Sequence, residues 1–230
     1  MLTFALVPVR ELSSAKTRLA GVLNNKKRAQ LTATMLSDVL DALCETRDIH
    51  QIVIVTRDVN AARLGVEKGA RILWEGGSHG LNPAVTKGVR FADREGADRV
   101  LVVPGDVPLA EPRHLRAILR AGCGSQSLIV PSCDGGGTNA LLLRPPGAMP
   151  VSYGRNSFKR HCRMARKRRL KIRILKPRSL QIDVDTPLDL RRVCLAPGNT
   201  RSQRLLRRQL GYRPARQIFS RPTSAQGRYE

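Results

Sequence analysis

Short apolar runs alternate along the chain with longer segments in which apolar residues recur every three or four positions. The first kind is typical of buried strands, and the second has the spacing of amphipathic helices. Strands are predicted at residues 3–9, 52–55, 70–74, 100–103, 128–131, 140–143, 170–175 and 180–184, and helices at residues 26–44, 60–68, 82–94, 112–121, 157–168 and 187–193. This alternation predicts an α/β domain with a mostly parallel central sheet.

Four predicted loops follow strands and therefore meet at one edge of that sheet. They span residues 10–18, 56–58, 75–82 and 104–106. Ligands of open α/β sheets bind beyond the carboxyl ends of the strands. We therefore expect the functional site among these loops.

Three aspartates stand at strand ends where a metal ion would be held. Asp106 follows the fourth predicted strand, and Asp183 and Asp185 close the last one. Residues at i and i+2 of a strand face the same side, so the last two acids can act together. Each acid alone also fits a structural role, since Asp106 could cap a turn and Asp185 could cap the helix at Pro187. Together they predict Mg²⁺, which prefers oxygen ligands, and hence phosphoryl or nucleotidyl transfer.

Two loops offer phosphate-binding groups. In the loop at residues 10–18, Lys16, Arg18 and backbone amides are suited to a triphosphate, although a solvated surface loop has the same composition. The glycine-rich loop at residues 75–82 would let the backbone approach a nucleotide closely, or would be a surface connection. The position of the first loop after the first strand favours it as the triphosphate site.

A second anion site is predicted where a glycine-rich turn and a helix start come together. Thr138 ends the turn at residues 131–140 and offers a hydroxyl and an amide, while Gly154 and Ser157 open the next helix. Helix N-termini bind anions. The alternatives are a plain hairpin turn and an ordinary N-cap made by Asn156 or Ser157.

Positive charge is concentrated toward the end of the chain. The formal net charge is +23, and residues 155–178 contain twelve Lys or Arg residues and no acid. Such a stretch attracts phosphorylated substrates or nucleic acid, or is a solvated face. Aromatic residues, on which bases would stack, make up only 3% of the chain, so specific nucleic-acid binding is not expected.

Composition also predicts the cellular context and a domain boundary. No apolar run approaches the length of a membrane span, and five widely spaced cysteines without a Cys-x-x-Cys pair indicate a reducing cytoplasm. Periodicity fades after residue 195. We therefore predict one domain at residues 1–195 and a basic, partly disordered tail at residues 196–230, in which residues 201–210 could form a helix.

Six short motifs occur in an order that resembles one enzyme family. They read VPVRELSSAKTRL, GLNPAV, PGDVPL, GGGTNALLL, YGRNSF and IDVDTPLDL, and the resemblance covers residues 1–193. The guanylyltransferases of coenzyme F420 biosynthesis, which are related to the molybdenum-cofactor guanylyltransferases, have motifs like these in the same order. The resemblance implies a single Rossmann-like nucleotidyltransferase domain of the nucleotide-diphospho-sugar transferase type.

The resemblance also implies a reaction and a set of residues. Family members transfer GMP from GTP to 2-phospho-L-lactate, phosphoenolpyruvate or 3-phospho-D-glycerate and release pyrophosphate. Matched position by position, the implied catalytic residues are Asp106, Lys16 and Arg18, and the implied Mg²⁺ ligands are Asp106, Asp183 and Asp185. The implied acceptor-binding residues are Thr138, Gly154 and Ser157, and the implied nucleotide-binding residues are Val7, Pro8, Lys16, Arg18, Gly80 and Asn82.

One departure from the family pattern bears on the acceptor. The family is expected to have Asp-Arg near Ser132 and Cys133, and here that Arg is missing. Loss of a bulky cation would make room for the extra hydroxyl of 3-phosphoglycerate, which tilts the expectation toward that acceptor. Two rivals stay open, a nucleotidyltransferase with a molybdopterin or sugar-phosphate acceptor and a nucleic-acid-binding protein. Protein partners compatible with the family are a second copy of the chain, in a homodimer, and the next enzyme of the pathway.

Overall fold

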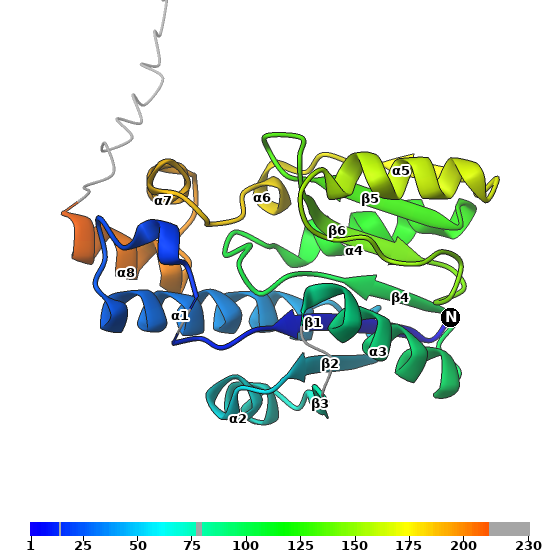
Figure 1. The fold of residues 1–230 in the computed structure, drawn as a ribbon, viewed down its shortest axis with the longest axis horizontal. Coiled ribbons are helices and arrows are strands. Elements are labelled where there is room, and N and C mark those ends of the chain that lie inside the picture. The colour runs from blue at the N-terminus through cyan, green and yellow to red at the C-terminus, as the bar shows by residue number, and fades with distance from the viewer. Residues whose placement is uncertain (14, 77–79, 212–230) are drawn as a thin grey trace, which may run out of the picture.

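A seven-stranded sheet forms the centre of the molecule in the computed structural model, which describes residues 1–13, 15–76 and 80–211. The strands lie in the order β3 (Arg71–Trp74), β2 (Gln51–Thr56), β1 (Thr3–Val9), β4 (Arg99–Val102), β6 (Thr138–Leu143), β5 (Ser127–Pro131) and β7 (Ile172–Ile174). β6 runs against both of its neighbours, and the other strand pairs are parallel. The predicted α/β fold with a mostly parallel sheet is confirmed (Figure 1).

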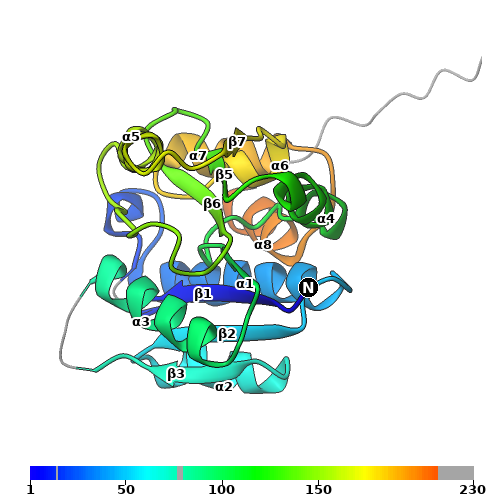
Figure 2. The same ribbon diagram turned by 90° about the vertical axis from the view of Figure 1, so that its right-hand side faces the viewer.

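Helices cover both faces of the sheet and bury an apolar cluster on each. One layer contains α1 (Asn25–Cys44), α2 (Val59–Glu67) and α4 (Pro112–Ala121), and the other contains α3 (Leu81–Arg94) and α5 (Ser157–Lys167). Figure 2 shows α3 and α5 toward the left of the sheet and α4 toward the right. Successive residues of β1 alternate between the layers, with Phe4 and Leu6 in one cluster and Ala5 and Val7 in the other, as the two-residue period of a strand requires.

A third apolar cluster lies beyond the carboxyl ends of the strands. It joins one end of α1 to α7 (Pro187–Leu195) and α8 (Arg201–Leu210), which stand at the left of Figure 1. Leu205 and Leu206 of α8 are buried there, and Arg201 forms an ion pair with Asp41 of α1 at 2.7 Å. The packed structure therefore continues past residue 195, where the sequence suggested that the domain ends. Residues 212–230 of the predicted tail lie outside the described residues.

The last predicted strand does not form. Residues Arg178–Gln181 make a short helix, α6, and the chain then crosses the carboxyl ends of the sheet without joining it. Its apolar side chains are buried in different clusters, Leu180 beneath α1 and α4 and Val184 in the third cluster. The apolar residues of the segment at 180–184 thus reflect burial in two different clusters and not the pairing of a strand. A hydrogen bond from the Val184 N–H to the Asp106 carbonyl, at 3.1 Å, ties this segment to the loop after β4.

Three connections complete the fold. Single 3-10 turns occur in the loop after β1 (η1, Thr17–Leu19) and after α4 (η2, Gly122–Gly124). β5 and β6 are joined by the hairpin turn that the glycine run allowed, with Pro131 paired to Thr138. Among the described helices, none is both long enough and apolar enough to cross a membrane.

The burial of α8 predicts that Leu206→Ala destabilises the whole domain. Leu206 is fully buried, and a large-to-small change of this kind leaves a cavity. We expect the free energy of unfolding, measured by urea denaturation, to fall by about 2–4 kcal/mol.

Leu195→Ala is the matched control, because the Leu195 side chain is 57% exposed. It should change the free energy of unfolding by less than about 0.5 kcal/mol. Equally small effects of both substitutions would show that α8 does not share the cooperative unit.

Candidate functional site

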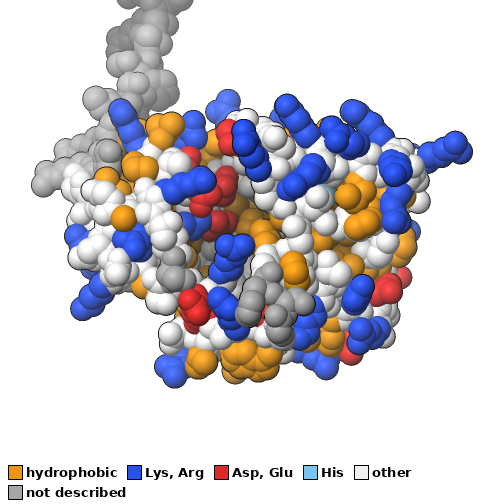
Figure 3. All heavy atoms as spheres, viewed as in Figure 1, with side chains coloured by type: hydrophobic (Ala, Val, Ile, Leu, Met, Phe, Trp, Pro, Cys, Tyr) orange, Lys and Arg blue, Asp and Glu red, His pale blue; other side chains and the backbone are white. Residues whose placement is uncertain are grey.

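A cavity of about 470 Å³ opens at the carboxyl ends of β1 and β4. It is lined by the end of β1 with its following loop, by the loop after β4, by two residues of α1, and by one residue each of α3 and the segment before α7. These residues are Pro8, Val9, Arg10, Glu11, Leu12, Ala15, Lys16, Thr17, Pro104, Gly105, Asp106, Thr32, Leu36, Leu81 and Asp185. Figure 3 shows acidic side chains within a hollow left of centre, with Lys and Arg side chains around it. This is the sheet edge at which a parallel α/β fold binds its ligands.

The loop after β1 is held by a buried aspartate from the loop after β2. One oxygen of Asp58 accepts from the Leu12 N–H at 2.8 Å, and the other caps α2 through the N–H groups of Asn60 and Ala61. Farther along this loop, Lys16 has a φ of 60°, a left-handed conformation that is uncommon outside glycine. From this turn its side chain reaches across to the loop after β4.

Lys16 is the centre of an ion-pair cluster at this cavity. Its Nζ atom lies 2.5 Å from Asp106 Oδ2 and 2.8 Å from Asp185 Oδ1, and its side chain is only 8% exposed. Burial by itself disfavours an ammonium group, but the two carboxylates outweigh this effect and raise the pKa of Lys16. One side chain thus joins three segments that are far apart in the sequence.

Negative charge exceeds positive charge around this cluster. Burial, with the nearby Asp106 carboxylate, raises the pKa of Asp183 to about 6, although Asn139 Nδ2 donates a hydrogen bond to Asp183 Oδ1 at 3.1 Å. Asp106 Oδ1 is buried and has no hydrogen-bond partner in the described part of the chain. A buried carboxylate oxygen without a donor is unfavourable. The site is therefore suited to a further cation or to donor groups of a ligand.

The three aspartates predicted to bind metal are neighbours, but they do not form a ready-made metal site. Within the described ranges, no group of three or more His, Cys, Asp and Glu side chains is placed to hold an ion. Instead, the Lys16 ammonium lies between Asp106 and Asp185. The unpartnered oxygen of Asp106 and the disfavoured charge on Asp183 fit a cation that would enter when Lys16 moves away.

The structural alternative for Asp185 is wrong. Thr186 is the N-cap of α7, and Asp189 completes a capping box by accepting from the Thr186 N–H at 2.9 Å. The Asp185 carboxylate is therefore left to pair with Lys16.

Thr138 and Ser157, predicted to bind the acceptor, are in direct contact. Because β6 is antiparallel to β4, its first residue lies at the same sheet edge as Asp106. Ser157 Oγ donates to Thr138 Oγ1 at 3.2 Å, and both residues are buried. Gly154, with a φ of 109°, precedes α5. Asn156 is the N-cap residue of α5 but makes no side-chain capping bond, so the ordinary cap is not what these residues provide.

Two polar residues that the sequence pattern did not single out belong to these groups. Asn139 follows Thr138 on β6 and binds Asp183, while His161 Nδ1 lies 3.0 Å from Thr138 Oγ1. Asn139 could have been noticed as a buried amide at the start of an apolar strand. His161 lies four residues after Ser157, which places both on one face of the helix.

The predicted nucleotide contacts are only partly gathered at the cavity. Pro8 lines it, and Val7 is fully buried in β1. Gly80, with a φ of 122°, is the N-cap residue of α3. Arg18 is exposed in η1 and is not one of the described residues that line the cavity. Residue 14 and residues 77–79, which fall in the two predicted phosphate and nucleotide loops, lie outside the described residues.

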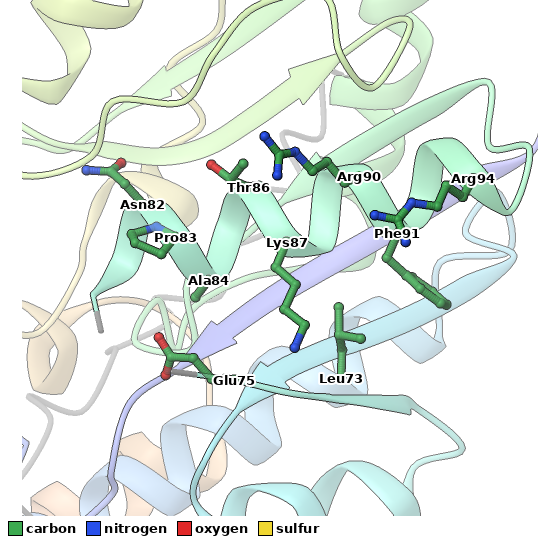
Figure 4. A pocket seen from close by; sticks show the side chains of 11 residues that line it. Leu73, Glu75, Asn82, Pro83, Ala84, Thr86, Lys87, Arg90, Phe91 and Arg94 are labelled. Carbon is green, nitrogen blue, oxygen red and sulfur yellow. The ribbon is translucent and has the colours of Figure 1, made fainter. Parts of the chain in front are cut away.

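Asn82 faces a second hollow, of about 610 Å³, along α3 and β3 (Figure 4). Its side-chain amide makes two hydrogen bonds with the backbone of Tyr153. The amide oxygen accepts from the Tyr153 N–H at 2.6 Å, and the amide nitrogen donates to the Tyr153 carbonyl at 3.1 Å. Lys87 extends across this hollow to the carbonyl of Trp74. Asn82 thus ties the start of α3 to the segment before α5, and this hollow contains none of the predicted catalytic residues.

Basic side chains cover the outer surface of α5. Apart from the half-buried Arg160, which donates to the Tyr153 carbonyl, these side chains are exposed, and none forms an ion pair with an acid in the described part of the chain. They are Arg155, Lys159, Arg163, Arg166 and Lys167. This positive face begins beside Ser157 and favours the approach of anions.

The fold has close structural relatives among nucleotide-transferring enzymes. A protein assigned as a nucleotide-diphospho-sugar transferase from Desulfovibrio desulfuricans superposes with a TM-score of 0.75 at 21% identity, over 92% of this chain and 96% of that one. The likeness defines the architecture as the nucleotide-diphospho-sugar transferase type, as the sequence suggested.

Sequence comparison gives the family. The chain belongs to the family described as guanylyl transferase CofC like, whose model matches residues 3–220. A phosphoenolpyruvate guanylyltransferase of Rubrobacter xylanophilus is 41% identical over 84% of this chain and 94% of its own length. A 2-phospho-L-lactate guanylyltransferase of Methanothermobacter thermautotrophicus is 34% identical over 90% of this chain and 91% of its own length. The chain is therefore an enzyme of the guanylyltransferase class.

The raised pKa of Asp183 predicts that Asp183→Asn stabilises the ligand-free protein at neutral pH. Because the folded carboxyl binds its proton more tightly than an unfolded one, ionisation destabilises the fold as pH rises from about 4 to about 6. Asparagine resembles the protonated acid. At pH 7.5 without divalent ions, we expect the variant to gain on the order of 2 kcal/mol in urea unfolding, and at pH 4 almost nothing.

Asp185→Asn is the control for this effect. Its carboxylate is half exposed and paired with Lys16, so its loss should leave the free energy of unfolding unchanged or lower it. A loss of stability in Asp183→Asn at pH 7.5 would contradict the charge imbalance described above.

Proposed function

We propose that this enzyme transfers GMP from GTP to phosphoenolpyruvate and releases pyrophosphate, a step of coenzyme F420 biosynthesis. The observation that carries the proposal is the cluster of Lys16 with three aspartates at the edge of the sheet. Asn139 connects this cluster to the Thr138–Ser157 pair, because it binds Asp183 and directly follows Thr138 on β6. A phosphate-binding cation, a metal-binding acid group and a second anion site are what two phosphorylated substrates need.

The donor triphosphate would occupy the cavity beyond β1 and β4. The loop after β1 would supply Lys16 and backbone amides to the phosphates, and Asp106 and Asp185 lie opposite this loop. The Lys16 ammonium would exchange its carboxylate partners for phosphate oxygens when GTP binds. That exchange keeps the buried charge paired before and after binding.

The acceptor would bind where β6 and α5 meet. Thr138 and Ser157 present hydroxyl groups, and Gly154 has a positive φ that favours glycine. An oxygen of the acceptor phosphate would form a new bond to the α-phosphorus of GTP, while the bond from that phosphorus to the bridging oxygen of pyrophosphate breaks. A phosphomonoester is largely dianionic at neutral pH, so no general base is needed and the residues act by positioning and charge.

Asp106, Asp183 and Asp185 would hold the Mg²⁺ that the unpartnered oxygen of Asp106 fits. When bound, the ion would neutralise charge on the phosphates. Asn139 keeps Asp183 oriented, and Lys16 determines whether the other two acids are free.

Two facts favour phosphoenolpyruvate over the 3-phosphoglycerate suggested by the missing arginine. Arg192 of α7 donates from Nη1 to Cys133 Sγ at 3.1 Å, so a guanidinium group occupies the region that seemed to have lost one. The relative with 41% identity is named for phosphoenolpyruvate. The missing arginine therefore no longer implies extra space for the hydroxyl group of 3-phosphoglycerate.

Pyrophosphate release tests the proposal directly. With Mg²⁺, we expect GTP and phosphoenolpyruvate to give the highest kcat/KM among GTP, ATP and CTP as donors and phosphoenolpyruvate, 3-phosphoglycerate and 2-phospho-L-lactate as acceptors. Asp106→Asn should lower kcat by at least about 100-fold at unchanged fold, since it removes charge required at the reacting phosphates. Preference for another acceptor would overturn the substrate, and normal kcat in Asp106→Asn would overturn the site.

The position of Lys16 predicts that it limits metal binding in the absence of nucleotide. In a calorimetric titration with Mn²⁺ or Mg²⁺, Lys16→Met should bind at least about tenfold more tightly than the unmodified enzyme, because Asp106 and Asp185 then lack their cation. Lys26→Met is the matched control, since Lys26 is exposed on α1 and does not line the cavity. Equal affinity of all three proteins would show that Lys16 and the metal do not compete.

A further inference from the structure

A buried histidine stands directly behind the Thr138–Ser157 pair. His161 lies one helical turn after Ser157 on α5 and has no exposed surface. Its Nδ1 atom is 3.0 Å from Thr138 Oγ1, and its Nε2 atom accepts from the Ser152 N–H at 2.8 Å. Both ring nitrogens are therefore occupied, one by a strand and one by the segment that leads to Gly154.

These two contacts decide which nitrogen holds the proton. A backbone N–H can only donate, so Nε2 must be unprotonated, and in a neutral ring the hydrogen is then on Nδ1. Burial, with the nearby Arg160 guanidinium, lowers the pKa of His161 to about 4, so the ring is neutral at neutral pH. His161 is thereby a hydrogen-bond donor toward Thr138.

The hydrogen bonds around Thr138 fix the direction of its own hydroxyl. Thr138 Oγ1 accepts from His161 Nδ1–H and from Ser157 Oγ–H, which uses both acceptor positions of a hydroxyl oxygen. Its hydrogen remains, and no described residue accepts it. A hydroxyl held in this way is a donor prepared for an anionic oxygen.

We propose that His161 is a positioning residue that fixes the Thr138 hydroxyl as a donor to an anionic oxygen of the acceptor substrate. The inference rests on the proposed function, because it takes Thr138 as part of the acceptor site. The same ring keeps the loop at residue 152 against β6, and the edge-to-face contact of His161 with Tyr153, at 5.1 Å between ring centroids, supports its orientation. One side chain thus links Thr138, Ser157 and the approach to Gly154.

Two amide substitutions separate positioning from mere packing. In His161→Asn, the side-chain amide reaches the place of Nδ1 and can still donate to Thr138. In His161→Gln, it reaches the place of Nε2 and keeps the contact with Ser152 instead. A purely structural role predicts similar losses in both variants, because each of them removes one hydrogen bond of the buried ring and keeps the other.

The positioning role predicts unequal losses. We expect His161→Gln to raise the KM for phosphoenolpyruvate about tenfold or more, as for loss of one hydrogen bond to a charged group, with the KM for GTP unchanged. His161→Asn should keep the acceptor KM within about threefold. Thr138→Val should have the same effect as His161→Gln, and the double variant should be no worse than either. Equal acceptor KM values in the two amide variants, or additive effects with Thr138→Val, would overturn the proposal.

Two measurements are independent of turnover. Calorimetric binding of phosphoenolpyruvate and of inorganic phosphate should weaken in His161→Gln and not in His161→Asn. The ¹⁵N signals of the imidazole, assigned by comparison with these variants, should show a proton on Nδ1 and none on Nε2 from pH 5 to pH 8. A proton on Nε2, or a charged ring, would refute the inference. Absence of turnover with every donor and acceptor would refute the proposed function instead, and the binding comparison would still decide the role of His161.

Discussion

The arrangement of this molecule depends on one buried ammonium group between carboxylates. Lys16 is brought in by a left-handed turn after β1, Asp106 by the loop after β4, and Asp185 by a segment that crosses the sheet. Each of these charges would be unfavourable if buried alone. Their pairing therefore requires that three distant parts of the chain meet at one edge of the sheet. The fold supplies that meeting point because its parallel strands all end there.

The charge cluster continues into the second half of the site through hydrogen bonds. Asp183, which forms no ion pair within the described residues, accepts a hydrogen bond from Asn139, and the residue before Asn139 is Thr138. Because neighbouring residues of a strand point to opposite faces, β6 serves both groups at once. Its reversed direction brings its first residues, rather than its last, to the carboxyl edge. A single antiparallel strand thus connects the region proposed for the donor with the one proposed for the acceptor.

Much of this architecture could be predicted from the sequence, and the failures have physical causes. The strand-and-helix alternation located the sheet, and the acids that follow predicted strands indicated the edge at which three aspartates come together, because both follow from burial and from sheet geometry. The segment at residues 180–184 imitated a strand, since its apolar residues are buried on two sides by different clusters. Asn82 is predicted as a nucleotide contact, and the sequence pattern gave no sign that its amide also binds the Tyr153 backbone. Tertiary hydrogen bonds of this kind leave no periodic signal, which is also why His161 was overlooked.

The order of the strands has a consequence for the time at which the site appears. β1, β2 and β3 are made first and are neighbours in the sheet, where the helices α1 and α2 connect them. Lys16 and Asp185 are 169 positions apart, and bringing such distant residues together has a larger entropic cost. A chain emerging from the ribosome therefore holds these three of the seven strands before the charge of Lys16 can be balanced on both sides. The Lys16 cluster can be completed only once the segment that carries Asp185, 169 positions after Lys16, has been made.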